Sequence, residues 1–411
     1  MMKDIELIKN TKARTSEGQR YELKDFDKEV MDEVRNFHKT LPDYEPTPLV
    51  DLKNLAKYLG VKKILVKDES KRFGLNAFKV LGGSYAMGKH IAEILDVPMK
   101  DLPFDVMISD ETKKKLGDVT FVTATDGNHG RGVAWTANRL KQKARVYMPK
   151  GSAQMRFDNI KKENAYVEIT DLNYDDAVRK GNAEVEENVA KGKNYVMVQD
   201  TAWEGYEKIP LWIMQGYATI MSEMLEQVKD LKPTHVFVQA GVGSFAGAMQ
   251  GLLSKTFGKD RPIVVVCEPH QANCIHRSFK QNNGKPFNIP NTEDLSTLMA
   301  GLSCGEPSTI SYKILNDYTD YSISCNDKIA AHGMRVLGAP LGDDTRVISG
   351  ESGAVGLGLV STLLDPSKGF TNIAKEIGLD ENSVILCVST EGDTDVESYR
   401  NITWNGTYTS L

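Results

Sequence analysis

Apolar and polar positions follow two different periods along most of this chain. Between residues 86 and 205, short runs rich in valine, isoleucine and threonine alternate with longer stretches whose apolar residues recur at helical spacing. The predicted strands are 119–124, 145–149, 166–169 and 195–200, and the predicted helices run from after Gly130 to about 142, from 153 to 161 and from 174 to 191. Strands that alternate with helices of this length are joined by right-handed crossovers, so the pattern predicts a parallel sheet.

A second series of the same kind begins with an apolar helix predicted over 211–228. Its strands, 235–239, 262–266 and 383–388, are almost continuously apolar, which is typical of strands covered on both faces. Residues 270–330 give weak signals, and we expect them to be irregular. We predict an α/β protein with two domains, each with a mostly parallel twisted sheet flanked by helices. The large domain takes residues 1–85 and 205–411, and residues 86–204 form a small inserted domain.

Composition narrows the classes of partner. A chain of 411 residues has room for two domains, and its net charge of −5 offers no basic surface for nucleic acid. No apolar run approaches the roughly 18 residues that a membrane helix needs, and the first residues lack an apolar signal segment. The histidines and five cysteines show no metal-ligand spacing. We therefore expect a cytoplasmic protein with no membrane partner and no metal. Cys274 and Cys304 could pair, but cytoplasmic thiols are normally reduced.

One lysine stands out in the apolar segment 76–85, between a predicted strand at 63–69 and a predicted helix at 85–95. Burial of Lys79 would favour the neutral amine, which is the form that attacks a carbonyl group. Most lysines with apolar neighbours nevertheless keep their head group in water. This segment alone therefore does not decide whether Lys79 is a buried, reactive amine or a solvated one.

A glycine-rich turn follows the predicted strand 235–239 and opens a helix. Backbone N–H groups of Gly241, Val242, Gly243 and Ser244 could close around a phosphate at the positive end of the helix dipole. The same stretch satisfies G-x-G-x-x-A, and Glu268 ends the next strand, as an NAD-dependent Rossmann dehydrogenase requires. A tight turn without a ligand is the third possibility.

Five turns, taken in order, resemble the motifs of the fold-type II pyridoxal-phosphate (PLP) enzymes related to threonine dehydratase and the tryptophan synthase β subunit. They are Pro46-Thr47-Pro48-Leu49, Asn76-Ala77-Phe78-Lys79, Asp126-Gly127-Asn128-His129, Gly241–Ser244 and Thr390-Glu391-Gly392-Asp393. A dehydrogenase would need only the fourth of these turns. Within the PLP family, the segments 76–85, 124–135 and 199–212 are most similar to diaminopropionate ammonia-lyases.

This resemblance implies a role for each matching residue. Lys79 would hold PLP through a Schiff base and then act as a base at the substrate Cα. Asn128 would bond the phenolic oxygen of PLP, and the amides of 241–244 would bind its phosphate. Thr390 would place a hydroxyl beside the pyridine nitrogen, which favours β-elimination over transamination. Glu351 is expected near the ring, whereas His129 is expected to pack beside Asn128. The inferred cofactor is therefore pyridoxal 5'-phosphate.

Asp126 departs from the dehydratase pattern, which has a small hydroxyl residue at this position. A carboxylate there is unfavourable unless a cation meets it, and the second ammonium group of 2,3-diaminopropionate would do so. By family position Asp126 faces Lys79 across the substrate, so it could take the Cα proton of the D enantiomer while Lys79 takes that of the L enantiomer. Thr125 and Asp200 are further substrate-binding candidates. Either aspartate could instead serve only as a turn or helix cap.

The expected function is PLP-dependent α,β-elimination of D- and/or L-2,3-diaminopropionate, a small amino-acid substrate, to pyruvate and two molecules of ammonia. The resemblance also implies a homodimer. A serine/threonine dehydratase of the same fold, an NAD-dependent dehydrogenase and a non-catalytic binding protein remain as alternatives.

Overall fold

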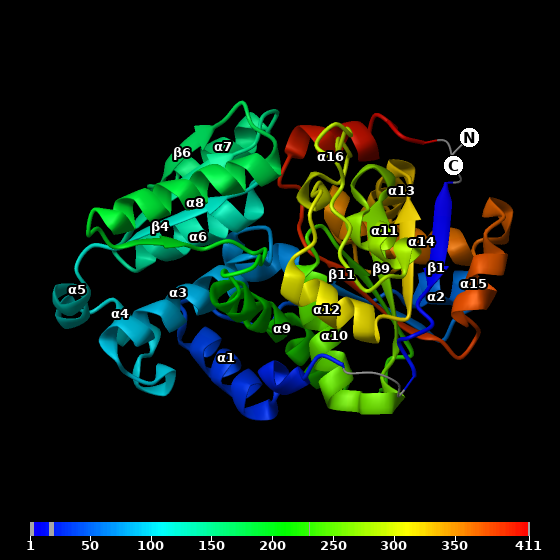
Figure 1. The fold of residues 1–411 in the computed structure, drawn as a ribbon. Coiled ribbons are helices and arrows are strands. Elements are labelled where there is room, and N and C mark those ends of the chain that lie inside the picture. Colours follow the sequence, from blue (N-terminus) through cyan, green and yellow to red (C-terminus); the bar gives the residue numbers. More distant parts are fainter. Residues whose placement is uncertain (1–3, 16–19, 230, 410–411) are drawn as a thin grey trace. The chain divides into compact units, whose positions relative to one another are not determined.

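The computed structural model describes residues 4–15, 20–229 and 231–409, which form two compact units (Figure 1). Unit 1 contains Met1–Leu23, Pro46–Ala77 and Ile220–Leu411, and unit 2 contains Lys24–Glu45 and Phe78–Thr219. The predicted inserted domain, 86–204, lies within unit 2, which also includes stretches on either side of it. The predicted division of the chain into functional domains stays a prediction.

Unit 1 is built on a seven-stranded sheet in the order β1-β10-β9-β8-β11-β3-β2. The strands are β1 (Ile5–Lys9), β2 (Leu49–Asp51), β3 (Lys63–Asp68), β8 (His235–Gln239), β9 (Ile263–Pro269), β10 (Tyr321–Cys325) and β11 (Val384–Ser389). The five central strands are parallel, and β1 and β2 pair antiparallel at the two edges. The mostly parallel sheet predicted from the sequence is therefore confirmed.

Helices of unit 1 cover this sheet and supply much of its core. They are α2 (Lys53–Leu59), α10 (Ser244–Phe257), α11 (Cys274–Gln281), α12 (Thr309–Tyr318), α13 (Asp327–Gly338), α14 (Glu351–Leu364), α15 (Thr371–Ile377) and α16 (Val396–Thr403). Every residue of α14 except its last is buried, and α14 packs on β8, β11 and α13. The expectation that 270–330 is irregular is wrong in part, because α11, α12 and β10 lie there.

Unit 2 contains a four-stranded parallel sheet in the order β6-β5-β4-β7. Its strands are β4 (Thr120–Ala124), β5 (Lys143–Met148), β6 (Tyr166–Ile169) and β7 (Tyr195–Met197). Its helices are α1 (Lys28–Thr40), α3 (Val80–Leu95), α4 (Phe104–Met107), α5 (Asp110–Leu116), α6 (Asn128–Arg139), α7 (Gln154–Lys161), α8 (Tyr174–Ala190) and the first part of α9 (Lys208–Val228). The predicted parallel sheet is confirmed here too. Helices α6 and α8 pack directly on its strands (Figure 1).

Four charged side chains form a buried network in unit 1. The carboxylate of Glu223 accepts from Lys67 Nζ at 2.6 Å and from Arg72 at 2.8 and 2.9 Å, while Arg72 also pairs with Glu69 at 2.9 Å. Burial alone would raise the pKa of Glu223, but Arg72 and Lys67 lower it to about 2. The four charges cancel, and the network holds the segment that follows β3 in place. Removing any one partner would leave a buried charge uncompensated and would destabilise the fold.

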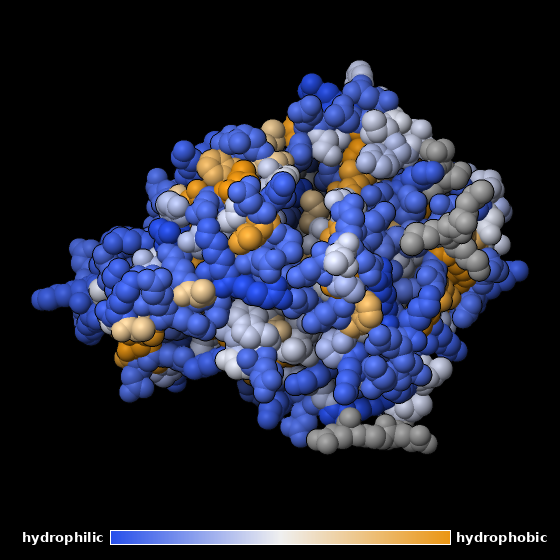
Figure 2. All heavy atoms as spheres, turned by 45° about the horizontal axis from the view of Figure 1, so that its top comes forward, coloured by the Kyte–Doolittle hydropathy of each residue, from blue (hydrophilic) through white to orange (hydrophobic). Residues whose placement is uncertain are grey.

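Figure 2 shows one face of the molecule, which is mainly hydrophilic with scattered apolar side chains. Trp404 is the most exposed of the large hydrophobic side chains described, at 86 %. Across the described ranges, we find no helix with the length and apolar character needed to span a bilayer.

Candidate active site

Lys79 lies at the start of α3, where it is the residue that precedes the first helical turn. Helix α6 packs directly against this point, since a Cβ atom added to Gly132 would lie 2.8 Å from Cα of Val80 and 3.2 Å from the carbonyl carbon of Lys79. The ammonium of Lys79 donates to Asp200 Oδ2 at 2.9 Å. The lysine side chain is 19 % exposed and the aspartate side chain 3 %, so this is a largely desolvated ion pair.

Asp200 follows β7 and is a buried carboxylate. Burial would raise its pKa, but the charge of Lys79, the charge of His129 and hydrogen bonds from Lys79 and Tyr217 hold the pKa well below its ordinary value. The hydroxyl of Tyr217 donates to Oδ2 at 3.2 Å. The next helix, α9, begins eight residues later, so the interpretation of Asp200 as a helix cap is wrong.

Two further side chains hold the backbone around Asp200. The amide oxygen of Gln199 accepts from the N–H of Ala124 and from Thr123 Oγ1, each at 2.9 Å. The hydroxyl of Tyr206 accepts from the N–H of Gln199 at 2.9 Å and donates to the carbonyl of Met197 at 2.8 Å. The carboxyl ends of β4 and β7 are tied together in this way. In the sequence, only the resemblance over 199–212 marked these residues.

Asp126 lies in the turn between β4 and α6, where the hydroxyl of Thr125 accepts from the N–H of Gly127 at 2.9 Å. Its carboxylate pairs with Arg156 of α7, with 3.0 Å between Oδ2 and Nη1. Gly127, without a side-chain cap, precedes α6, so Asp126 is a turn residue and not its N-cap. The cation that a carboxylate at this position requires is therefore present in the protein itself, because Arg156 supplies it.

His129 lies among the charged candidates. Its Nε2 is 2.7 Å from the carbonyl of Val198, which can only accept, so Nε2 carries the hydrogen. Its Nδ1 is 3.9 Å from Asp200 Oδ2. Burial lowers the pKa of His129, and the charges of Asp200, Lys79 and Asp126 also act on the ring. Unit 2 therefore brings Lys79 and Asp200 together beside this imidazole, and the charge of Asp126 also acts on the ring. Asn128 starts α6 beside them and is partly exposed.

The glycine-rich turn of unit 1 lies at the start of α10. Gly243 has φ of 95°, which favours glycine, and Ser244 begins the helix. Among the described residues, no group of the protein accepts a hydrogen bond from the amides of Gly241, Val242 and Gly243. Unpaired amides at the positive end of a 14-residue helix provide the donors that a phosphate needs.

Thr390 lies just after β11 in unit 1 and is 5 % exposed. The amide nitrogen of Gln239 donates to its Oγ1 at 2.9 Å and to two backbone carbonyls at 3.0 Å. Because Oγ1 accepts from Gln239, the threonine can donate its own hydrogen to another group. Glu351 is also buried, and its carboxylate accepts from the hydroxyl of Ser398. The five cysteines, including Cys274 and Cys304, are buried thiols that form no disulfide with one another.

Glu268 does not have the geometry that the dehydrogenase alternative requires. Its carboxylate is fully buried and accepts from the N–H groups of Ile275 and His276 at 2.9 and 2.6 Å, at the start of α11. A ribose-binding carboxylate must instead face a ligand. This residue therefore gives no support to an NAD site.

Glu268 should also make stability depend on pH. Burial raises its pKa from 4.5 to about 8, despite hydrogen bonds from Ile275 and His276 that lower it. The folded state then keeps a proton that the unfolded state has lost, so the free energy of unfolding should fall between about pH 5 and pH 8, by up to roughly 1.4 kcal/mol per pH unit. Glu268→Gln should remove this slope in urea unfolding measured at each pH. The same slope in the unmodified protein and in Glu268→Gln would contradict the assignment of this pH dependence to Glu268.

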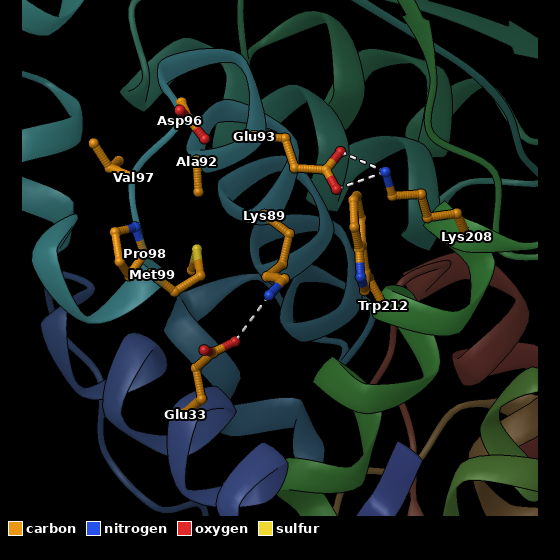
Figure 3. Close-up of a pocket in the computed structure, with 10 residues that line it drawn as sticks. All are labelled: Glu33, Lys89, Ala92, Glu93, Asp96, Val97, Pro98, Met99, Lys208 and Trp212. Carbon is orange, nitrogen blue, oxygen red and sulfur yellow. Dashed lines mark hydrogen bonds and ion pairs between the residues drawn. The ribbon is translucent and has the colours of Figure 1, made fainter. Parts of the chain in front are cut away.

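A separate pocket of about 650 Å³ in unit 2 contains none of the residues predicted for the site. Figure 3 shows Glu33 paired with Lys89, and Glu93 paired with Lys208, on either side of Trp212. The ammonium groups lie 6.0 and 5.1 Å from the Trp212 ring centroid. These pairs join α1, α3 and α9. Because each acid already has a lysine as its partner, the pairs have a structural role, and the pocket is not our candidate active site.

The residues described in the two units fit the chemistry of PLP. Unit 2 provides an amine, Lys79, at a helix start beside a buried carboxylate. Unit 1 provides amides that can bind a phosphate and a hydroxyl, that of Thr390, that can donate to a neutral ring nitrogen. An amine that can bind a carbonyl group and a phosphate cradle are the two features that this cofactor requires.

Comparison with known proteins gives the family. Residues 40–369 match the model of the family described as pyridoxal-phosphate dependent enzyme. The diaminopropionate ammonia-lyase of Salmonella typhimurium is 50 % identical over 378 residues, which cover 91 % of this chain and 92 % of that protein. An L-threonine dehydratase of the same organism is 25 % identical over 77 % of this chain and 52 % of that protein.

A solved structure shows the same fold. The diaminopropionate ammonia-lyase of Escherichia coli, in complex with an aminoacrylate-PLP azomethine reaction intermediate, superimposes with a TM-score of 0.87 and is 44 % identical. The match covers 98 % of each chain. The fold-type II architecture expected from the sequence is thus confirmed. Sequence identity, coverage and fold agree, and the chain belongs to the pyridoxal-phosphate-dependent enzymes, within their diaminopropionate ammonia-lyase group.

Proposed function

We propose that this protein is a PLP-dependent carbon–nitrogen lyase that eliminates ammonia from 2,3-diaminopropionate and yields pyruvate and a second molecule of ammonia. The observation that carries the proposal is the desolvated ion pair of Lys79 and Asp200, in a chain that is 50 % identical over 378 residues to a diaminopropionate ammonia-lyase. A lysine held beside a carboxylate at a helix start is suited to covalent cofactor chemistry and to proton transfer.

Four features of the chain would hold the cofactor. Lys79 would bind its carbonyl carbon, Asn128 its phenolic oxygen, the amides of 241–244 its phosphate and Thr390 its ring nitrogen. When bound, PLP withdraws electrons from the substrate Cα and so weakens the bonds at that carbon. The neutral hydroxyl of Thr390 cannot hold the ring nitrogen protonated as a carboxylate would. The resulting weaker electron withdrawal suits elimination better than transamination.

Residues of unit 2 would act on the substrate. Lys79 would remove the Cα proton of the L enantiomer, and Asp126 would remove that of the D enantiomer. Asp200, Asp126 and Thr125 would contact the substrate, and Asp126 and Asp200 are the two candidates for binding its second ammonium group. These assignments are supported by the contact of 2.9 Å between Lys79 and Asp200 and by His129, whose Nδ1 lies 3.9 Å from Asp200.

The finer biological setting is also a proposal. We propose that the enzyme works in the cytoplasm as a homodimer, on a small amino-acid substrate and without nucleic-acid partners. The absence of a basic charge excess supports the last point. Size-exclusion chromatography with light scattering would test the oligomeric state.

An absorbance spectrum of the purified protein tests the proposed function directly. A band near about 410–420 nm, typical of lysine-bound PLP, should change when D- or L-2,3-diaminopropionate is added, and pyruvate should appear. Serine and threonine are the controls for the dehydratase alternative, which would be favoured if only these substrates gave a keto acid. No band after reconstitution with PLP would contradict the proposal, and an NAD titration would then be the next measurement.

A further inference from the structure

Asp126 has a cationic partner within unit 2 that the proposed function does not yet use. Arg156 lies in the first turn of α7, and its Nη1 is 3.0 Å from Asp126 Oδ2. The arginine side chain is 8 % exposed and that of the aspartate 19 %. Both residues follow neighbouring parallel strands, β4 and β5, so they emerge at the same edge of the sheet.

The local backbone seats this arginine. A Cβ atom added to Gly127 would lie 2.9 Å from Cδ of Arg156 and 3.3 Å from its Cβ and Cγ. The stem of the arginine therefore runs across a position where only glycine leaves room. The hydrogen bond from the Gly127 N–H to Thr125 Oγ1 fixes the turn on the other side of Asp126. With the backbone fixed on both sides, Arg156 determines the direction in which the carboxylate points.

The two carboxylates of the candidate site have partners of different kinds. Asp200 is paired with Lys79, which must be a neutral amine when it takes the Cα proton of the L enantiomer. Asp126 is paired with an arginine, which stays protonated under all ordinary conditions. Of the two carboxylates, Asp200 is therefore the one whose partner must lose its charge during the reaction. A buried carboxylate that loses such a partner is a favourable place for a new ammonium group.

We propose that Arg156 is a positioning residue that holds Asp126 for proton transfer and, by neutralising it, leaves recognition of the substrate's second ammonium to Asp200. The proposal rests on the proposed function. In the step concerned, the Cα proton of the D enantiomer passes to an oxygen of Asp126. The electron pair of the Cα–H bond forms the Cα–Cβ double bond, and the Cβ–N bond breaks so that the β-ammonium leaves as ammonia.

Three variants test this proposal with the PLP-loaded enzyme. Arg156→Gln should lower kcat for D-2,3-diaminopropionate by about 10- to 100-fold, because a misdirected base loses reactive geometry. It should change kcat for the L enantiomer, and KM for both, by less than about threefold, because the L enantiomer depends on Lys79 and ammonium recognition on Asp200. Arg156→Lys keeps the charge and should recover part of the loss. Gly127→Ala, which displaces the arginine stem, should resemble Arg156→Gln.

Two results would overturn the proposal. Equal losses with both enantiomers, with the PLP absorbance band retained, would mean that Arg156 has a structural role only. A lower KM for both enantiomers in Arg156→Gln would mean that Arg156 competes with the substrate ammonium at Asp126. If the unmodified enzyme released no pyruvate from either enantiomer, the proposed function itself would fail, which is a distinguishable result.

A measurement on the cofactor-free protein tests the ion pair without activity. Asp126→Asn and Arg156→Gln should each lower Tm, and the double variant should lower it by clearly less than the sum, since the residues interact directly. Additive shifts would contradict the pairing on which the proposal depends.

Discussion

Replacing Lys79 by alanine is expected to abolish both the absorbance band of bound PLP and the release of pyruvate. Without the amine, no side chain at the start of α3 can bond the cofactor or accept the Cα proton of the L enantiomer. Loss of both roles should lower kcat by at least about 10⁴-fold. The measurements are the spectrum after reconstitution and the initial rate of pyruvate formation with each enantiomer.

The same substitution should destabilise the cofactor-free protein. Asp200 is fully buried, and in Lys79→Ala it would lose the ammonium that lies 2.9 Å away. Leaving this carboxylate without its cation should lower the free energy of unfolding by about 2–4 kcal/mol. The double variant Lys79→Ala/Asp200→Asn is the matched control, because it removes the charge as well. A double variant no more stable than the single one would show that the ion pair has little energetic weight.

The sequence predicted the sheets well because their strands are continuously apolar. The burial of every residue of β4, β8 and β11 matches that signal. In contrast, β1 is an edge strand with one buried residue in five, and its sequence, Ile-Glu-Leu-Ile-Lys, is neither continuously apolar nor strictly alternating. Helix α11 and strand β10 were missed because both are short, and α11 is followed by a long irregular stretch. In such regions tertiary contacts, and not periodicity, decide the local structure.

The candidate site was only partly predictable for a different reason. Lys79, Asp126 and Asn128 could be named because they stand in motifs that resemble a known family. Arg156 lies 30 residues from Asp126, and Tyr217 lies 17 residues from Asp200, in helices whose sequences carry no mark of the site. Packing of α7 and α9 brings these groups in. An interpretation from sequence could therefore name the charges but not their partners, and for Asp126 the missing partner changed the interpretation.

Asp126→Asn is expected to separate the two enantiomers of 2,3-diaminopropionate. If Asp126 removes the Cα proton of the D enantiomer, asparagine should lower kcat for D by about 10²-fold or more, since a positioned base contributes about that much. The L enantiomer depends on Lys79, so its kcat should fall less than about tenfold. Initial rates of pyruvate release, measured with each enantiomer separately, give the ratio of the D rate to the L rate.

The control for Asp126→Asn is the state of Arg156. In this variant the arginine keeps its position over Gly127 but faces a neutral amide. If this unmatched charge destabilised the protein, the rates with the D and L enantiomers would fall together. The double variant Asp126→Asn/Arg156→Gln lacks the unmatched cation. Its ratio of the D rate to the L rate should be as low as in Asp126→Asn alone. A ratio near that of the unmodified enzyme, in either variant, would mean that one base, Lys79, serves both enantiomers.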